Sequence, residues 1–503
     1  MNDPRRASTA LACISYVLAA IALCIALGWL AARITASQLL DQAQQQLACI
    51  ENGQPLWHWR LQRPHDLIAG RAFGNARLAR DGGMLAITSM DGTAFELGLP
   101  IAWSLDLAHW PILELSMQSD AHGTLGLVRQ DNETSACVAL AAAPLTPGMR
   151  VLRLDMRQLS WRSAQGMACP APGVVRMLRL RVQIPAGTTL RIASAALLAA
   201  EPIPHAQNMA LDLPAGATED DVEHIATRAQ TWPAPVFRLP AGISADRMLA
   251  LRDQLRAHWP AALIVPAGAN PQAARPARSY PLTAWAACVV YWLALAGLLL
   301  NPIKGPLRPW LEVAGCLGGP LWLVIGLHWG LHPSLSGMFA FAGGLAFALA
   351  IERRHLPRLW RWPATWRVWL WPLAPVPVAA GLIIFWGHRL QPLAPVHAFT
   401  YFGWAWLQQW LMLVVLMQRF ERMGPRPGWA VIAIATTFAL LHTPNGLLMQ
   451  CCFVAELWWA RCFLRSRTVL PIALAHAACA LLAESGLVGG TLRSLEVSAR
   501  FFL

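Results

Sequence analysis

Four polar side chains in the C-terminal half of the chain stand in apolar stretches that are long enough to cross a bilayer. They are the amides of Gln408 and Gln409 and the imidazoles of His442 and His476. Polar groups at such depth are costly, so those found there are functional-site candidates by default. Together they can hold a water molecule or a divalent metal such as zinc in a protein-lined cavity. All four are therefore candidate catalytic residues, and His442 and His476 are also candidate metal ligands.

The spacing of these residues allows them to share one layer of the membrane. Gln408 lies about 15 Å, His476 about 12 Å and His442 about 20 Å from the inner end of its predicted helix, at about 1.5 Å per residue. Span limits predicted from a sequence are uncertain by about 2–4 residues at each end, which accounts for the difference between these three depths. Phe438 and His442 share a helix face, and Pro444 then bends or ends that helix.

The elements that must position these residues are the apolar runs after residue 280. Several of them approach the roughly 20 residues that a bilayer core requires, and the run 448–463 is short. Eight spans are predicted here: 281–301, 310–331, 335–352, 367–387, 397–418, 429–447, 448–463 and 468–486.

Basic residues predict the topology of these spans. Arg5 and Arg6 precede an uncharged apolar run at 10–32, which is longer than the roughly 7–15-residue core of a cleaved signal peptide, so a signal anchor with a cytoplasmic N-terminus is expected. The outer loops hold only Arg389 before the tail, whereas arginine collects in the loops expected inside. Those inner basic residues are Lys304, Arg308, Arg353, Arg354, Arg358, Arg361, Arg367, Arg419, Arg422, Arg426, Arg461, Arg465 and Arg467.

This pattern predicts an integral protein of the bacterial inner membrane, with residues 1–35 forming the cytoplasmic tail and anchor and residues 36–280 in the periplasm. The composition agrees, because 56% hydrophobic and 13% charged residues over 503 positions are too apolar for a soluble protein and too polar for spans alone. The net charge of +13 comes almost entirely from arginine. Much of it lies in short loops, which favours the lipid bilayer over nucleic acid as the partner.

The hydrophilic segment 36–200 shows the alternation of a β-sandwich. Apolar and polar residues alternate at 113–117, 152–156 and 177–183, which is typical of half-buried antiparallel strands. The outline loosely resembles carbohydrate-binding jelly rolls. Two interpretations of its tryptophans stay open, stacking platforms for sugar rings or members of the core: Trp57, Trp59, Trp103, Trp110 and Trp161. A glycan or a protein is the expected partner of this domain.

Residues 201–270 carry an internal repeat. The turns 213–216, 239–242 and 265–268 each read Pro-Ala-Gly after an apolar residue, and each follows a strand-like run. Helical patterns at 219–230 and 245–259 fill the gaps, which predicts a small β-α-β-α-β subdomain with parallel strands. A linker at 271–280 leads to the polytopic membrane domain, residues 281–503.

Cysteines outside the predicted spans are few. Cys49, Cys137 and Cys169 allow one disulfide and one free thiol at most.

The membrane motifs now support a family resemblance. The region 397–486 resembles the CPBP intramembrane proteases, the CAAX prenyl protease, bacteriocin-processing and Abi-like group. That family shows a Glu-Glu-x-x-x-Arg helix, then Phe-x-x-x-His, then His-x-x-x-Asn or Asp, in the context of eight spans. Phe438 to His442 matches the second motif, and the run from Ala460 to His476 resembles the approach to the third.

The chain departs from this family at three positions. The paired glutamates are Gln408 and Gln409, the arginine falls on Leu413, and the final Asn or Asp falls on Ala480. In the family, a glutamate and the histidines are thought to activate water for peptide hydrolysis. Glutamine cannot take up a proton as a general base, although it can orient a water by hydrogen bonds.

Two carboxylates in or near the spans can substitute for the missing glutamates. They are Glu456 and Glu484, and each can equally be an interfacial or paired carboxylate. The resemblance implies an intramembrane endopeptidase that hydrolyses a peptide bond of a membrane-associated protein. The alternative is a non-catalytic membrane scaffold or receptor whose outer domain binds a glycan or a protein.

Overall fold

The structure is a computed structural model, and it divides into two compact units. Met1–Thr35, Ser244–Arg247 and Arg278–Leu503 form a helical unit, and Ala36–Ile243 and Met248–Ala277 form a β-rich unit. The described residues are 4–131, 136–203, 210–218, 221–222, 225, 232–272, 281–301, 303, 305–326, 334–353, 362–363, 365–424 and 427–502.

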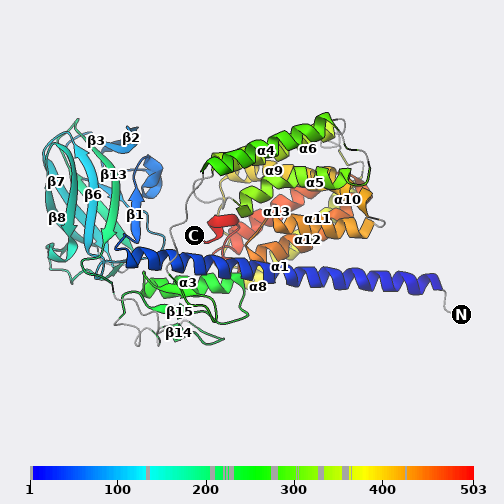
Figure 1. The fold of residues 1–503 in the computed structure, drawn as a ribbon, viewed down its shortest axis with the longest axis horizontal. Helices are drawn as coiled ribbons and strands as arrows, with labels where there is room; N and C mark the ends of the chain where they lie inside the picture. The colour runs from blue at the N-terminus through cyan, green and yellow to red at the C-terminus, as the bar shows by residue number, and fades with distance from the viewer. Residues whose placement is uncertain are drawn as a thin grey trace. The chain divides into compact units, whose positions relative to one another are not determined.

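Helix α1, Pro4–Glu51, is a single helix of 48 residues (Figure 1). The sequence predicts an apolar run ending at residue 32, and the helix continues for several more turns. Its buried positions recur every fourth residue, at Leu27, Ala31, Thr35, Leu39 and Ala43. That spacing places one stripe of the helix against the protein.

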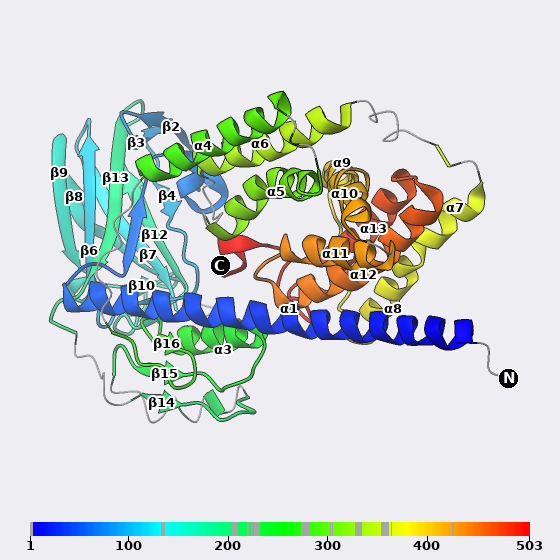
Figure 2. The ribbon, with the colours of Figure 1, turned by 45° about the vertical axis from the view of Figure 1, so that its right-hand side comes forward.

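The β-rich unit contains two antiparallel sheets. One has the order β2-β3-β13-β6-β9, with β1 also paired to β13, and the other has the order β10-β8-β7-β12-β4 (Figure 2). Leu115 of β6 and Leu127 of β7 are fully buried in one common core, so the sheets pack as a sandwich. The strands are β1 Trp57–Arg60, β2 Ala76–Asp81, β3 Met84–Ser89, β4 Phe95–Gly98, β5 Leu105–Asp106, β6 Ile112–Ser119, β7 Gly123–Gln130, β8 Ala136–Leu145, β9 Gly148–Asp155, β10 Arg162–Ser163, β11 Val174–Val175, β12 Met177–Gln183 and β13 Thr189–Leu198.

The tryptophans of this unit belong mostly to its core. Trp57, Trp59, Trp110 and Trp161 are each less than a tenth exposed. Trp103 is half-buried and donates its indole N–H to the Pro260 carbonyl. The interpretation of the four buried rings as sugar-stacking platforms is therefore wrong, because a platform must present its face to the ligand.

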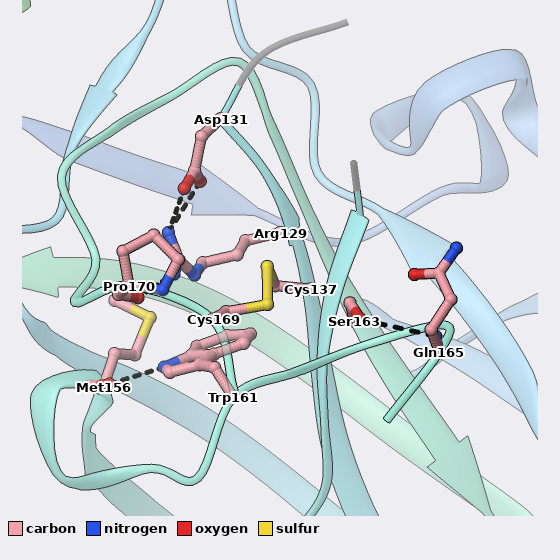
Figure 3. Close-up of a disulfide and its surroundings, with 9 residues drawn as sticks. All are labelled: Arg129, Asp131, Cys137, Met156, Trp161, Ser163, Gln165, Cys169 and Pro170. Carbon is pink, nitrogen blue, oxygen red and sulfur yellow. Dashed lines mark hydrogen bonds and ion pairs between the residues drawn. A yellow bond between two sulfur atoms is a disulfide. The ribbon is translucent and has the colours of Figure 1, made fainter. Parts of the chain in front are cut away.

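A disulfide joins Cys137 of β8 to Cys169, as Figure 3 shows. Next to it, the buried Arg129 side chain lies over the Trp161 ring at 5.0 Å and binds the Asp131 carboxylate at 2.6 Å. Cys49 is a free thiol. The expected limit of one disulfide and one free thiol among these three cysteines is confirmed.

The small α/β subdomain has the predicted parallel strands. β14 Leu211–Asp212, β15 Val236–Arg238 and β16 Leu263–Val265 pair in that order, and α3, Ala245–His258, connects the last two. Most of the first predicted helix, 219–230, lies outside the described residues, as does most of the linker 271–280.

The described residues contain five helices that are long and apolar enough to cross a membrane, by length and composition. They are Ile14–Glu51, Leu282–Leu300, Leu335–Glu352, Trp366–Trp386 and Gly446–Ser466. Strongly exposed apolar side chains such as Leu282, Leu293, Ile384 and Phe385 suit a lipid environment. The elements are α4 Pro281–Leu300, α5 Arg308–Leu321, η4 Trp322–Gly326, α6 Leu335–Glu352, α7 Trp366–Leu370, η6 Trp371–Leu373, α8 Pro375–Trp386, α9 Pro395–Gln409, η7 Trp410–Leu416, α10 Met417–Met423, α11 Pro427–Leu440, α12 Gly446–Ser466, α13 Leu470–Gly486 and η8 Ser498–Phe502.

Several predicted spans differ from the observed helices. The predicted span 367–387 is divided into α7, η6 and α8. The predicted helix 429–447 ends at Leu440, because the segment from His442 to Pro444 forms a turn. The predicted helix 397–418 is interrupted after Gln409 by the π-helical turn η7, and helical structure then continues to Met423.

Candidate active site

The two glutamines occupy the last positions of α9 and face different surroundings. Gln409 is fully buried, whereas Gln408 is half-buried and lines a cavity. The π-helical turn that follows shifts the helical register after Gln409. Such turns occur often at functional sites, because they redirect side chains without ending the helix.

His442 lies in the turn between α11 and α12. Its Nδ1 lies 2.8 Å from the Phe438 carbonyl oxygen, and the two rings are 4.8 Å apart. A carbonyl oxygen can only accept, so Nδ1 carries the proton and the neutral ring keeps a lone pair on Nε2. His442 is thus held in the tautomer that a general base requires.

His476 lies on α13 among aromatic rings. The ring centroids of Phe438 and Trp459 are 5.4 and 5.3 Å from that of His476, and that of Tyr401 is 6.5 Å away. Phe438 therefore contacts both candidate histidines. The structure gathers His442 and His476 around one phenylalanine, as their predicted common depth requires.

A buried hydrogen-bonded chain links His476 to a carboxylate. The amide nitrogen of Gln409 donates to Glu456 Oε2 at 2.9 Å and lies 3.4 Å from His476 Nδ1. Gln409 and Glu456 are both fully buried. Because the amide donates to Nδ1 of His476, the proton of the neutral ring is on Nε2, which is the opposite tautomer from that of His442.

One oxygen of each partner in this chain has no hydrogen bond within the described part of the protein. These atoms are Gln409 Oε1 and Glu456 Oε1. A buried acceptor without a hydrogen bond costs free energy. A water or a substrate group that reaches this layer would satisfy them.

No polar group reaches the cavity from the positions of Glu484, Leu413 or Ala480. Glu484 binds His397 at 2.9 Å and does not line the cavity, so it is a paired carboxylate and not a substitute base. Leu413 is buried in η7, and Ala480 lines the cavity without a polar group. Of the two carboxylates considered from the sequence, Glu456 is the one that reaches the site.

A cavity of about 830 Å³ opens beside this cluster in the helical unit. Its polar lining includes Gln408, His442 and His476, and most of its remaining lining is apolar. Glu496 and Arg500 from the C-terminal segment also line it. No motif pointed to this segment, since its residues match no family pattern and follow the last apolar run.

The donor set does not suit a structural or catalytic zinc ion. Such sites use three or four protein ligands, and the described residues contain no group of three His, Cys, Asp or Glu side chains that can hold a metal. Both histidines also use Nδ1 in hydrogen bonds to protein groups. We therefore derive no step through a metal.

A second buried polar cluster lies on α5, α6 and α10. Arg419 donates from Nε to Glu312 at 2.9 Å and from a terminal nitrogen to Glu352, and Arg308 binds the other oxygen of Glu312 at 2.8 Å. Arg419 is only 3% exposed. The interpretation of Arg419 as a loop residue is wrong, because it lies within helix α10, where Glu312 and Glu352 bind it.

The candidate site falls within a match to a known family. Residues 355–482 match the family model described as type II CAAX prenyl endopeptidase Rce1-like. The match confirms the resemblance to the CPBP intramembrane proteases. Together with the apolar helices, it identifies the chain as an integral membrane protein with a protease-like membrane region. No curated protein matches the chain.

Solved structures offer a distant likeness that involves a different type of protein. A family 29 carbohydrate binding module is 10% identical, with a TM-score of 0.20, and covers 28% of this chain and 88% of the module. A mutant of such a module complexed with mannohexaose is 9% identical, with a TM-score of 0.20, and covers 28% of this chain and 91% of the module. A likeness this weak does not bear on sugar binding.

Proposed function

We propose that this chain is an intramembrane endopeptidase that hydrolyses a peptide bond of a membrane-associated protein, with its catalytic groups at the end of α9 and on α11–α13. The observation that carries the proposal is the pairing of two histidines in opposite tautomers around Phe438, beside an apolar cavity. One ring offers a lone pair and the other offers a proton, which hydrolysis needs at the same time.

The first chemical step assigns His442 as the base. Its Nε2 accepts a proton from a water molecule while the water oxygen attacks the carbonyl carbon of the scissile bond. The carbonyl oxygen becomes an oxyanion, and amide or imidazole N–H donors stabilise such a charge. Gln408 and His476 line the same cavity and supply those donors.

The second step returns the proton. Protonated His442 gives it to the nitrogen of the leaving amine as the carbon–nitrogen bond breaks, which yields a free carboxylic acid and a free amine. The carboxylic acid then passes its proton to the amine or to water. His442 then regains its starting tautomer, since Nδ1 remains bonded to the Phe438 carbonyl throughout.

Glu456 takes the electrostatic place of the glutamates that are absent at 408 and 409. It does not line the cavity, so its carboxylate acts through Gln409. The Glu456 carboxyl accepts one N–H of the Gln409 amide, which orients that amide toward Nδ1 of His476. The carboxylate thus reaches the site from α12 and not from α9.

The disulfide supports the proposed topology. Cys137 and Cys169 form a disulfide in the β-rich unit, and disulfides persist in oxidising compartments such as the periplasm. We therefore propose that residues 36–280 are periplasmic, that the N-terminus is cytoplasmic, and that the membrane is the bacterial inner membrane. The domain boundaries predicted from the sequence form part of this proposal.

The test uses the full chain in native membranes. Newly formed peptide termini of membrane proteins are compared between cells that carry the wild-type chain and cells that carry His442→Ala or His476→Ala. Each substitution is expected to lower cleavage by about 10²–10⁴-fold. His397→Ala is the matched control, because His397 pairs with Glu484 and does not line the cavity. Equal cleavage by the wild type and both site variants would contradict the proposal and favour a non-catalytic scaffold.

A further inference from the structure

The C-terminal segment Leu487–Phe502, here called the strap, is bound to the turn that carries His442. The Asn445 side chain and the Ser498 backbone make the connection. Asn445 donates from Nδ2 to the carbonyl oxygens of Ser494 at 2.7 Å and Glu496 at 3.3 Å. The backbone N–H of Ser498 donates to the Thr443 carbonyl oxygen at 2.8 Å.

These contacts are buried, and the backbone of Ser498 is strained. Asn445 is fully buried and Ser498 is 3% exposed. Ser498 has a φ of 59°, in the left-handed region that residues other than glycine rarely adopt. Its hydroxyl donates to the Val324 carbonyl oxygen at 2.6 Å, so one residue joins the strap to both η4 and the His442 turn. A non-glycine residue keeps such a conformation only where its surroundings fix it.

Asn445 also begins the helix that carries Glu456. Its side-chain oxygen caps α12 by accepting from the Leu448 N–H at 3.2 Å. The same amide therefore fixes the start of α12 with its oxygen and the strap with its nitrogen. The strap in turn contributes Leu492, Leu495 and Val497 to the cavity lining.

We propose that the strap is a positioning element of the active site, which holds the His442 turn in place through Asn445 and Ser498. The inference rests on the proposed function for its catalytic meaning, because His442 is the base of that reaction. The hydrogen bonds themselves fix the turn whatever reaction occurs there. Asn445 and Ser498 are thus positioning residues that touch no substrate.

The test measures the chemical accessibility of His442 directly. The detergent-solubilised full chain is treated with diethyl pyrocarbonate, and modified histidines are located by mass spectrometry. Asn445→Asp retains an oxygen that can cap α12 but loses the donor to the strap carbonyls. Removing buried donors shifts a local opening equilibrium by about tenfold, so His442 modification is expected to rise by about that factor. Modification of His397 is expected to stay unchanged.

A second, milder variant keeps the inference testable if Asn445→Asp does not fold. Ser498→Gly loses the hydroxyl but keeps the backbone N–H and accepts a positive φ without strain. A smaller rise in His442 modification is expected. Thr491→Val is the matched control. Thr491 also lies on the strap, but its hydroxyl donates to the carbonyl oxygen of Trp386 in α8. The inference would be overturned if modification of His397 rose as much as that of His442, or if modification of His442 were unchanged in both test variants.

A kinetic readout separates this inference from the proposed function. Where cleavage is measurable, both strap variants are expected to lower kcat and to leave KM within about twofold, because neither Asn445 nor Ser498 lines the cavity. Absence of cleavage by the wild-type chain contradicts the peptidase alone. An unchanged rate of His442 modification in the strap variants contradicts only the positioning role of the strap.

Discussion

The helical unit contains two buried polar clusters that are built in opposite ways. Around Arg419, two buried carboxylates meet two guanidinium groups, those of Arg419 and Arg308, and Glu312 uses both oxygens in ion pairs. Around Gln409, one carboxylate meets an amide and an imidazole, and two buried oxygens have no hydrogen bond within the described residues. No residue of the first cluster lines the cavity, whereas His476 of the second cluster lines it.

This difference separates a cluster that lies away from the cavity from one that reaches it. Polar residues deep in a membrane region are functional candidates by default, but the Arg419 cluster shows that depth alone is insufficient. A cluster whose charges are all paired contributes to the packing of α5, α6 and α10. The Gln409 cluster includes His476, which lines the cavity, and it can therefore act on a molecule bound there.

The largest expected effect comes from removing the central cation of the Arg419 cluster. Arg419→Met leaves Glu312 and Glu352 buried without their main partner, and this is expected to lower the free energy of unfolding by about 3–5 kcal/mol. Thermal unfolding of the solubilised chain measures the change. Arg422→Met on the same helix is the control, because Arg422 is exposed and should shift stability by less than about 0.5 kcal/mol. Equal stability of the two variants would remove the structural role of Arg419.

The next largest effect concerns an amide that lines the cavity. Gln408→Leu removes a donor that faces the oxyanion and is expected to lower kcat by about 10²–10³-fold without loss of stability. Gln450→Leu is the control, because Gln450 also lines the cavity but donates to the Cys24 carbonyl. If both variants lose activity to the same extent, the effect belongs to the cavity wall and not to an oxyanion donor.

The smallest expected effect comes from replacing the buried carboxyl group of Glu456. Glu456→Gln keeps the volume and is expected to lower kcat by about 10–100-fold, the range found for residues that orient a functional histidine from behind. Unfolding should be nearly unchanged, since a neutral side chain replaces a buried acid. Glu484→Gln provides the comparison, because that carboxylate pairs with His397. An active Glu456→Gln enzyme would show that the carboxylate is dispensable.

The candidate residues could be predicted from sequence more fully than their surroundings. The order of Gln408-Gln409, Phe438/His442 and His476 was sufficient to identify the family-like region and to predict a common depth. It could not show which glutamine is buried, since neighbouring residues on a helix point in different directions and a π-helical turn follows. Nor could it choose Glu456 over Glu484, because that choice depends on which helix packs against α9.

The fold shows the same division between local and long-range information. Period-two alternation correctly predicted strands such as β6, β9 and β12, because alternation reflects burial on one face of a sheet. The continuation of α1 to Glu51 and the attachment of the strap to the His442 turn depend on distant packing partners. The buried state of Arg419 depends on such partners as well, so charge in a short sequence window gave the wrong interpretation.

The central claim is that the carboxylate serving this site is provided by α12 in place of α9. Exchanging the two side chains tests it most directly, by measuring peptide cleavage for Gln409→Glu, Glu456→Gln and the double variant. Gln409→Glu alone places two carboxylates in contact, which must share a proton and should impair the site. The double variant restores one carboxylate and one amide in the reverse order, and cleavage is expected to recover to within about tenfold of the wild type. A double variant as inactive as the weaker single variant, or single variants as active as the wild type, would contradict the claim.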